Sequence, residues 1–450
     1  MGLAYQHCGT FLKAKLPFDV DLLACHALNP KRYPFLLESH QLSKPATGFD
    51  ILFAYPGDVI QTSKGGDTDF FTQFDSAFNQ ALVEEELTLD SSLPFTGGWF
   101  VFLSYELAGA IEPKLSSLAV DATLPVASAV RIPVAIIKNH KDNTCWIVCE
   151  IDAEERLEEV WSDIQILAPT AIISPRASLT EDTPTLFLEG VKKVKSYLKE
   201  GDTLQVNLSR QWVGKLLDKA NYLDVYRSLR AHNPAPFAGL ARYGDSVICS
   251  SSPERLVSCN AGAVQMRPIA GTRPRKKNPN EDKKSADALL VNAKENAEHI
   301  MLIDLIRNDL GRVCQTGTVV VDEKMTLESY AAVHHIVSNV RGKLLANTTP
   351  SDVIKAVFPG GTITGCPKVR CMEIIQELEK KPRGAYTGSM GYINRNGDLD
   401  LNILIRTFTI TDKKISLQTG AGIVADSIAD NELDETRHKA KALLDALTIA

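Results

Sequence analysis

FPGGTITGCPK, at residues 358–368, is the stretch of this 450-residue chain that says most about its fold. Gly360 and Gly365 have the spacing of the two glycines in a phosphate-binding loop, but a cysteine and a proline follow where such a loop needs lysine and a hydroxyl. A nucleotide site is therefore not expected. The stretch predicts either a tight turn ahead of a helix over residues 369–378 or a loop for a small anionic ligand, with threonine hydroxyls and the cation of Lys368.

The composition is that of a globular protein without a general affinity for polyanions. The chain is 44% hydrophobic and 23% charged, and its net charge of -6 disfavours binding to nucleic acid or to an anionic membrane. Its nine cysteines include only one close pair, Cys145 and Cys149, without the histidines of a zinc site. The most apolar run, 124–137, contains Arg131 and is too short to span a bilayer, and the N-terminus lacks a signal-peptide pattern. We expect a cytoplasmic protein with reduced thiols.

Three parts can be distinguished along the chain. Residues 1–165 mix strand-like and helical segments, residues 166–185 form a proline-containing linker, and residues 186–450 carry several strands and long helices. Strands cluster before helices instead of alternating with them, which favours an α+β fold over a doubly wound parallel sheet. The expected strands include 50–55, 98–104, 246–250 and 402–410 and a hairpin of 129–137 with 144–151, and the expected helices include 73–85, 153–167, 186–199 and 283–306.

Some polar side chains have an ordinary structural interpretation when each is taken alone. The strand predicted over residues 203–209 turns Gln205 and Asn207 to one face and its leucines and valine to the other, as a half-exposed strand does. Glu254 follows another strand and, taken alone, is a solvent carboxylate that pairs with Arg255.

The glutamates in the predicted helices also have an ordinary structural interpretation when each is taken alone. Glu298 has mainly apolar neighbours at helical spacing, where a bare carboxylate is costly. Glu432, Glu435 and Lys439 share one face of the C-terminal helix, which alone indicates a surface salt bridge worth about 0.3–0.5 kcal/mol.

The opening loop belongs to a series of motifs in a fixed order. Before it come QVNLS (205–209), SSPERL (251–256), PIAGTRPR (268–275), DLIRNDLGRV (304–313) and VHHIVS (333–338), and after it come IRT (405–407), GAGIVADS (420–427) and DETRHKA (434–440). Together these motifs resemble the chorismate-utilising enzymes, a family that includes the synthase subunits of anthranilate synthase and aminodeoxychorismate synthase and the isochorismate and salicylate synthases. The resemblance is dense from about residue 185 to 444.

A weaker resemblance covers the N-terminal part. LLES (36–39), TGGWFVFLSYEL (96–107) and NPAPF (233–237) look like the two aminating subunits. The resemblance implies an α+β fold with a large antiparallel β-sandwich core and helices packed outside. It also implies an N-terminal region over 1–165 like that of anthranilate synthase component I and a chorismate-binding catalytic region over 186–450.

The resemblance implies a catalytic set of five residues. Glu254 would be the general acid that protonates the departing C4 hydroxyl of chorismate, and a positioned proton donor is worth roughly 10²–10⁴ in rate. Gln205 stands where water-adding members carry a lysine base and ammonia-adding members carry glutamine, so it implies amination. Ala270 stands where many aminodeoxychorismate synthases carry a lysine thought to attack C2, and Thr272 and His335 would line the ring pocket.

Magnesium and the two carboxylates of chorismate are further partners that the resemblance implies. Glu298 and Glu435, with Glu432, would hold Mg²⁺, which takes a couple of carboxylates and completes its shell with water and ligand oxygens. Lys439 would meet one substrate carboxylate, and Arg406 would meet the other as a planar fork. The remaining substrate contacts would come from Gly361, Thr362, Thr364, Tyr386, Gly420, Ala421 and Gly422.

Two aminating activities fit these motifs. The loop GGTITGCPK, the motif VHHIVS and the short chain favour aminodeoxychorismate synthase component I, whereas Ala270 is the residue of anthranilate synthase component I. The expected product is 4-amino-4-deoxychorismate, the precursor of 4-aminobenzoate and folate; the alternative products are anthranilate and pyruvate, for tryptophan biosynthesis. No glutaminase signature is found, so ammonia is expected from a separate glutamine amidotransferase subunit, or from free ammonium.

A third possibility is a catalytically silent partner subunit that binds tryptophan. The intact Glu254, Glu298, Glu435 and Lys439 argue against it. LLES and NPAPF resemble the parts of the family that hold tryptophan. The residues of this candidate tryptophan site are Glu38, Ser39, Asn233, Pro234, Pro236 and Phe237.

Overall fold

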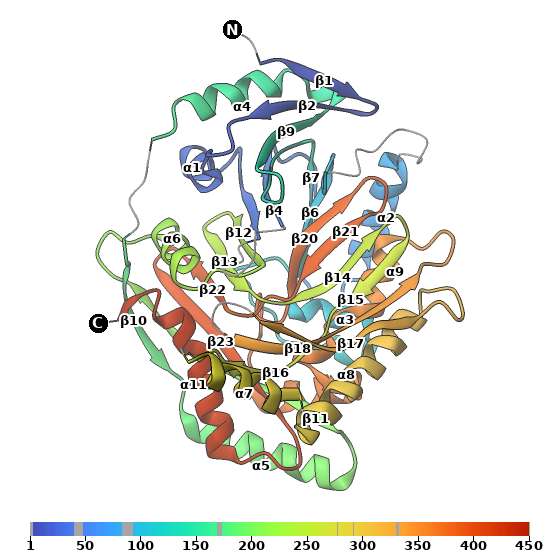
Figure 1. The fold of residues 1–450 in the computed structure, drawn as a ribbon, viewed down its shortest axis with the longest axis vertical. Coiled ribbons are helices and arrows are strands. Elements are labelled where there is room, and N and C mark those ends of the chain that lie inside the picture. Colours follow the sequence, from blue (N-terminus) through green and yellow to red (C-terminus); the bar gives the residue numbers. More distant parts are fainter. Residues whose placement is uncertain are drawn as a thin grey trace.

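Within the residues that the structure describes, the framework is a pair of large sheets, of 14 and 10 strands (Figure 1). The computed structural model describes residues 3–39, 48–82, 93–168, 173–276, 278–290, 292–329 and 333–449. In sheet order, the larger sheet consists of β1 (Tyr5–Cys8), β2 (Phe11–Leu16), β9 (Thr144–Glu150), β8 (Val134–Asn139), β4 (Phe49–Ala54), β3 (Phe35–Glu38), β12 (Phe237–Tyr243), β13 (Ser246–Ser252), β22 (Thr407–Thr411), β23 (Lys414–Ile423), β11 (Gln205–Leu216), β10 (Arg176–Glu181) and β24 (Thr448–Ile449), with β19 (Gly365–Cys366) also beside β11.

The smaller sheet is antiparallel, and so is the larger one apart from the pairing of β10 with β24. In order, the smaller sheet consists of β16 (Ile269–Pro274), β18 (Val333–Lys343), β15 (Ala263–Met266), β14 (Arg255–Asn260), β21 (Leu399–Asn402), β20 (Ser389–Asn394), β6 (Gly98–Leu103), β7 (Ala127–Ile132) and β5 (Val59–Thr62), with β17 (Val320–Ser329) also beside β18.

Apolar side chains from both sheets fill the space between them. Phe35 of β3 and Phe100 of β6 stack across this interior with ring centroids 4.1 Å apart. Along β6 the side chains alternate: Phe100 and Phe102 face the interior, and Trp99 and Val101 face the helices outside. Both faces of this strand are therefore buried, which explains its uninterrupted apolar sequence.

Helices cover the outer faces of both sheets, which confirms the predicted α+β class with an antiparallel β-sandwich core. The larger sheet is covered by α1 (Leu22–Leu28), α4 (Arg156–Gln165), α6 (Tyr222–His232) and α11 (Ala429–Leu444), and the smaller one by α2 (Asp69–Ala81), α8 (Ala293–Gly311) and α9 (Pro350–Val357). Around β11 pack α5 (Pro184–Glu200) and α10 (Lys368–Glu379), α7 (Pro279–Leu290) packs on β16, and the short α3 (Ala108–Ile111) follows β6.

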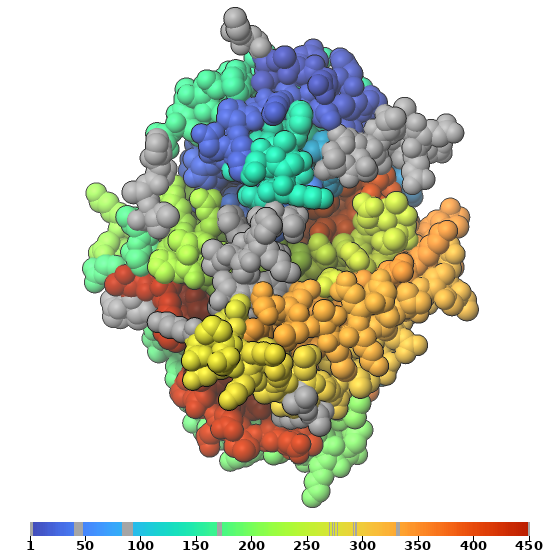
Figure 2. Space-filling model, viewed as in Figure 1, coloured from blue at the N-terminus to red at the C-terminus, as the bar shows by residue number. Residues whose placement is uncertain are grey.

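Strands from the N-terminal and C-terminal parts of the chain share each sheet. In the larger sheet β3 pairs with β12, and in the smaller one β6 pairs with β20. Figure 2 shows the N-terminal segment (blue) at the upper end of the molecule and the segment of α11 (red) near its lower end. The predicted linker, 166–185, contains β10, which pairs with β11 and β24, so it is not a linker throughout; its residues 169–172 lie outside the described ranges.

Three predicted elements are divided in the structure. The predicted strand 402–410 is interrupted between β21 and β22, which belong to different sheets, and 129–137 is divided at Pro133 between β7 and β8 because proline cannot continue a ladder. The predicted helix 283–306 is two helices, α7 and α8. The side chain of Asn292 accepts a hydrogen bond from the amide of Glu295 (3.1 Å) and caps the start of the second helix.

None of the helices in the described ranges combines the length and the apolar character that crossing a bilayer requires.

Candidate active site

The candidate site lies where the chain twice crosses from one sheet to the other. Glu254 lies between β13 of the larger sheet and β14 of the smaller one, and Arg406 lies between β21 and β22, which cross in the opposite direction. The amide of Ser251 donates to the carbonyl of Arg406 (3.0 Å), and the amide of Ile403 donates to the carbonyl of Glu254 (3.0 Å). Arg406 has a φ of 53°, a turn conformation that a strand does not use. The two crossings therefore place Glu254 and Arg406 on neighbouring segments.

Glu254 is a buried carboxyl group with an elevated pKa. The residue is 8% exposed, and its Oε1 accepts a hydrogen bond of 2.7 Å from the hydroxyl of Thr362. Burial raises the pKa of Glu254 to about 7, against the lowering effects of that hydrogen bond and of the Lys439 charge. A carboxyl group with this pKa is partly protonated near neutral pH, so it can act as a general acid.

The glycine- and threonine-rich loop is packed tightly against α8. A Cβ on Gly361 would lie 2.2 Å from Leu305 Cδ2, so a larger residue there would require the Leu305 side chain to move. Thr362 reaches Glu254, as described above. Thr364, predicted as a substrate contact, is fully buried and donates its hydroxyl hydrogen bond to the carbonyl of Gly360 (2.9 Å). Its hydroxyl thus supports the loop, and its contact with the substrate stays a prediction.

The side chain of Lys368, the cation predicted for this loop, also makes its contacts within the protein. Lys368 Nζ lies 2.6 Å from Asp309 Oδ2 and donates to the carbonyl of Val357 (3.2 Å). The carboxylate of Asp309, near the end of α8, is buried, and the first residue of α10 neutralises it. Lys368 therefore joins two helices and is not the ligand cation that the sequence suggested.

Helix α11 packs against β23 and brings two charged side chains to it. Lys439 Nζ donates to the carbonyl of Gly420 (2.8 Å) and lies 2.7 Å from Glu435 Oε1. Arg406 donates to the backbone carbonyl of Lys439 (2.5 Å). Burial lowers the pKa of Arg406, while Tyr386 and Glu435 act in the opposite direction. These contacts bring Arg406 and Lys439 together beside the predicted general acid.

Strand β11 presents two amide side chains to the glycines of β23. Asn207 is paired with Gly422, and Gln205 lies two residues earlier on the same face. A Cβ on Gly422 would lie 2.2 Å from Gln205 Nε2, and one on Gly420 would lie 2.6 Å from Asn207 Oδ1 and 2.8 Å from the Tyr386 hydroxyl. A side chain at position 422 would require Gln205 to move, and one at position 420 would also lie 2.9 Å from the backbone oxygen of Leu208, so the two glycines leave room for these groups. Between them, Ala421 is buried and pairs with Leu208.

The amide oxygens of Gln205 and Asn207 are buried, and no hydrogen-bond donor of the described ranges reaches either one. A buried acceptor without a partner costs about 1–3 kcal/mol, so two of them on one face favour a ligand that donates hydrogen bonds. On the other face, Val206 and Leu208 join the core as predicted. Leu204 does not: it is 61% exposed, because β11 begins only at the next residue.

The predicted ring-pocket residues lie on the neighbouring strands β16 and β18. Thr272 is paired with His335, and the ladder is irregular between Ala270 and Thr272. His335 Nδ1 lies 3.3 Å from the carbonyl oxygen of Gly271. Burial lowers the pKa of His335, and the charge of Arg406 lowers it further, against the hydrogen bond to Gly271. The side chains of Ala270 and Thr272 are outside the described part of the structure.

The glutamates predicted to hold magnesium come from two helices. Glu298 lies on α8, whereas Glu432 and Glu435 lie on α11. Across the described ranges, no three His, Cys, Asp or Glu side chains are grouped as metal ligands, so the predicted trio is not a ready-made site. The side chain of Glu435 is 49% exposed and thus accessible. Carboxylates from two helices fit magnesium when water and ligand oxygens complete its shell.

Sheet pairing brings together the two segments of the candidate tryptophan site. β3 ends at Glu38 and pairs with β12, which begins at Phe237. Glu38 is buried, and its carboxylate accepts hydrogen bonds from Tyr226 (2.8 Å) and Arg230 (3.0 Å), with which an incoming ammonium group would compete. Tryptophan binding stays a prediction. The other members of the set, Ser39, Asn233, Pro234 and Pro236, flank these two strands.

Sequence reasoning missed a buried ion pair next to Tyr386. Arg383 NH2 lies 2.6 Å from Glu379 Oε1, and their side chains are 1% and 8% exposed. The only signal in the sequence was an i,i+4 pair, which usually marks a helix surface.

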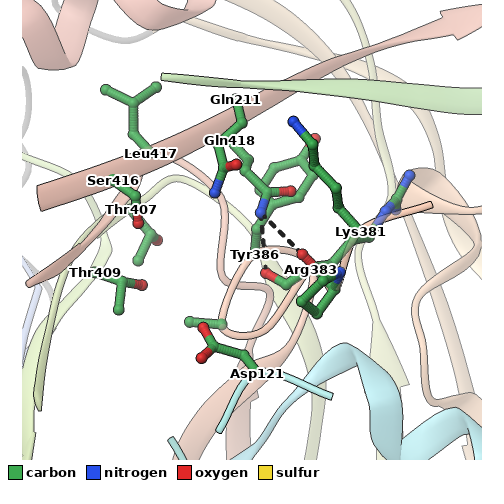
Figure 3. Close-up of a pocket in the computed structure, with 12 residues that line it drawn as sticks. Asp121, Gln211, Lys381, Arg383, Tyr386, Thr407, Thr409, Ser416, Leu417 and Gln418 are labelled. Atoms are coloured by element: carbon green, nitrogen blue, oxygen red, sulfur yellow. Dashed lines mark hydrogen bonds between the residues drawn. The ribbon is translucent and has the colours of Figure 1, made fainter. Parts of the chain in front are cut away.

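A polar pocket borders the same segment, where Gln418 donates to the carbonyls of Pro382 and Arg383 (both 3.4 Å; Figure 3). Tyr386 lines this pocket and Glu254 does not, so the pocket adjoins the site without containing the acid.

Comparisons with known proteins agree with the order of motifs. A sequence profile described as chorismate binding enzyme matches residues 35–445. An anthranilate synthase component I-like protein of Synechocystis sp. is 47% identical over 358 residues, which cover 79% of this chain and 73% of the relative. Aminodeoxychorismate synthase component 1 of Bacillus subtilis is 38% identical over 460 residues, which cover 97% of each chain. The crystal structure of anthranilate synthase component I from Streptococcus pneumoniae TIGR4 matches with a TM-score of 0.78 at 32% identity, covering 90% of this chain and 94% of that one.

Proposed function

Since this chain belongs to the chorismate binding enzyme family and is a chorismate-utilising synthase, we propose that it aminates chorismate to 4-amino-4-deoxychorismate, the precursor of 4-aminobenzoate and folate. The observation that carries the amination is the pair of buried amide oxygens on β11. Gln205 Oε1 and Asn207 Oδ1 have no donor from the described ranges; they can accept hydrogen bonds from a ligand but cannot take up a proton at neutral pH. They suit ammonia, which donates N–H bonds and is already nucleophilic, whereas water would need a base.

Glu254 supplies the proton that the leaving group needs. When ammonia attacks C2, the ring double bonds shift, the C4–O bond breaks and the proton of Glu254 passes to the hydroxyl, which leaves as water. The new C2 ammonium group returns a proton to Glu254. A second ammonia then attacks C4, the C2–N bond breaks, and Glu254 protonates the departing amine. Ala270 carries no amine, so we expect no covalent adduct with the substrate at this position.

The two carboxylates of chorismate are matched by two cations. Arg406 offers its remaining guanidinium donors to one carboxylate, and Lys439 offers its ammonium group to the other. A magnesium ion held by Glu298 and Glu435 would neutralise a substrate carboxylate when bound.

The position of amination is inferred from the match with one relative and from the motifs. The aminodeoxychorismate synthase of Bacillus subtilis matches over 97% of both chains, and the loop GGTITGCPK and the motif VHHIVS favour the same activity. Ala270 favours the alternative, anthranilate synthase component I, which adds ammonia at C2 and then eliminates pyruvate. The relatives named for anthranilate synthase keep this alternative as the second candidate.

We infer that a glutamine amidotransferase subunit supplies the ammonia. The relatives are named as component 1 of a synthase, which implies a further component, and the sequence carries no glutaminase signature of its own. Free ammonium at higher concentration should replace the partner in assays.

The amination is tested by mass analysis. Chorismate, magnesium and ammonium chloride incubated with the purified chain should give a product that has gained ammonia and lost water, at a rate that depends on ammonium. A product that forms without ammonium, has the mass of chorismate and separates from chorismate on chromatography would show that water is the nucleophile and would overturn the proposal.

Replacing Gln205 with lysine should reduce the rate of amination and allow slow formation of isochorismate. Lysine would place an amine base beside Gly422, where it can activate water, and it would remove one of the two amide oxygens. Chromatographic separation of the products measures both rates. If the variant aminates at the wild-type rate, Gln205 does not face the nucleophile.

A further inference from the structure

We propose that Arg383 is a positioning residue, which fixes the strand that faces ammonia relative to the loop that holds the general acid. The proposal rests on the function proposed above, because it assigns the two sides of the site to ammonia and to the leaving group. It adds a residue that contacts neither the substrate nor Glu254 directly.

All five N–H donors of the Arg383 guanidinium are satisfied by protein acceptors. Nε donates to Glu379 Oε2 (2.9 Å), NH1 donates to the carbonyl of Ile363 (3.1 Å) and to Thr387 Oγ1 (3.3 Å), and NH2 donates to the carbonyl of Asn207 (2.8 Å) and to Glu379 Oε1 (2.6 Å). Arginine has no further donors to offer. The group is therefore held in one orientation, and each acceptor is fixed relative to the others.

Two of these acceptors belong to opposite sides of the site. The carbonyl of Asn207 belongs to β11, whose side-chain amides we assign to ammonia. The carbonyl of Ile363 belongs to the residue after Thr362, whose hydroxyl bonds the carboxyl of Glu254. The guanidinium group of Arg383 thus fixes the distance between β11, which faces ammonia, and Thr362, which orients the carboxyl of Glu254. Glu379 strengthens the link, because its Oε1 also accepts the amide of Ser209 on β11 (2.8 Å).

The surroundings immobilise Arg383 itself. Its guanidinium carbon lies 4.8 Å from the ring centroid of Tyr105 and 5.5 Å from that of Tyr386, which borders the site. The backbone amide of Arg383 donates to Glu106 Oε1 (2.7 Å). Gln418 contacts the backbone carbonyl of Arg383 from the polar pocket (Figure 3). The N-terminal region therefore contributes to the position of this side chain through Tyr105 and Glu106.

A lysine at position 383 cannot form the hydrogen bonds that Arg383 forms. It carries three donors on a single nitrogen, so it can reach at most some of the four acceptor residues and cannot span them as a plane. With a lysine, the loop and β11 should be free to shift relative to each other while the ion pair with Glu379 persists. A displacement of about 1 Å can cost roughly 10²-fold in rate.

The test compares Arg383→Lys with a matched control, Arg210→Lys. Arg210 lies on β11, one of the segments that Arg383 contacts; its side chain is also 1% exposed, it pairs with Asp182 (3.1 Å), and it stacks on Trp212 (5.1 Å). Both variants should lose thermal stability to a similar degree. Only Arg383→Lys should lower kcat, by about 10²-fold, with less change in the KM for chorismate. Its kcat should also persist to higher pH, because loss of the Thr362 hydrogen bond raises the pKa of Glu254.

Equal kcat values for the two variants, or an unchanged pH profile in Arg383→Lys, would overturn the proposal and leave Arg383 with a role in stability alone. If Arg383→Lys does not fold, Glu379→Gln provides the same test, since glutamine keeps the shape but loses one acceptor and the charge. It should show a smaller loss of kcat in the same direction, and wild-type kcat and pH profile would again overturn the proposal.

Product identity is recorded in every assay. A wild-type chain that aminates C2 refutes only the proposed product, whereas one that adds water refutes both proposals.

Discussion

Replacing Glu254 with glutamine should lower kcat by roughly 10²–10⁴-fold and leave the KM for chorismate nearly unchanged. Glutamine keeps the acceptor oxygen for Thr362 but cannot protonate the leaving hydroxyl. The loss should therefore fall on the chemical step and not on binding. Steady-state kinetics with ammonium as the nucleophile measures both parameters.

The pKa of the same carboxyl group determines how the kcat of the wild-type enzyme should depend on pH on the alkaline side. Its pKa of about 7 results from burial, partly offset by the Thr362 hydrogen bond and the Lys439 charge. The acid is active when protonated, so kcat should fall as the pH rises through about 7. Glu254→Gln should lack this decline.

A matched control is Glu150→Gln. Glu150 is also a buried carboxylate, and it pairs with Arg131 (2.7 Å) in the N-terminal region. This variant should lower thermal stability without lowering kcat. If Glu254→Gln retains turnover comparable to that of Glu150→Gln, Glu254 is not the general acid.

Removing either predicted magnesium ligand should abolish most of the activity. Glu298→Gln and Glu435→Gln each take one charge from the ion, and we expect turnover to fall by about 10²-fold or more at saturating chorismate. The ion pair of Glu435 with Lys439 is half exposed, so its loss should cost little stability. Calorimetric titration of Mg²⁺ in the presence of chorismate and without ammonium should show weaker binding in both variants.

Asp434→Asn is the control for the magnesium prediction. Asp434 lies on the same helix, its side chain is 61% exposed, and it pairs with Arg437 (3.2 Å). This variant should bind magnesium and turn over like the wild type. Wild-type turnover of both glutamate variants at saturating magnesium would show that the metal assignment is wrong.

Elements with an unbroken periodicity could be predicted from the sequence almost to the residue. The helix expected over 369–378 is α10 (Lys368–Glu379), and the strand expected over 98–104 is β6 (Gly98–Leu103). The order of motifs likewise indicated the family, which the matching sequence profile confirms, whereas the roles that the motifs imply for Glu254 and Lys439 stay predictions. The predictions of these elements and of the family succeed because hydrophobic periodicity and sequence motifs depend only on residues that are close together in the sequence.

The features that the sequence did not reveal depend on contacts between distant segments. Arg406 lies in a turn because the chain changes sheet there, although its neighbours are typical of a strand. Lys368 pairs with Asp309, and the hydroxyl of Thr364 donates to the carbonyl of Gly360, two contacts that the sequence did not indicate. Arg383 was overlooked because its acceptors come from β11, the loop and α10, and nothing in its own segment indicates them.

The central claim is that this chain delivers an amine to C4 of chorismate. The most direct test incubates the chain with chorismate, magnesium and ammonium, and couples the product to a lyase that converts 4-amino-4-deoxychorismate to 4-aminobenzoate. We predict 4-aminobenzoate, formed only when the lyase is present, and no chorismate adduct in the intact mass of the enzyme. Anthranilate without 4-aminobenzoate would contradict the claim and establish the alternative, anthranilate synthase component I.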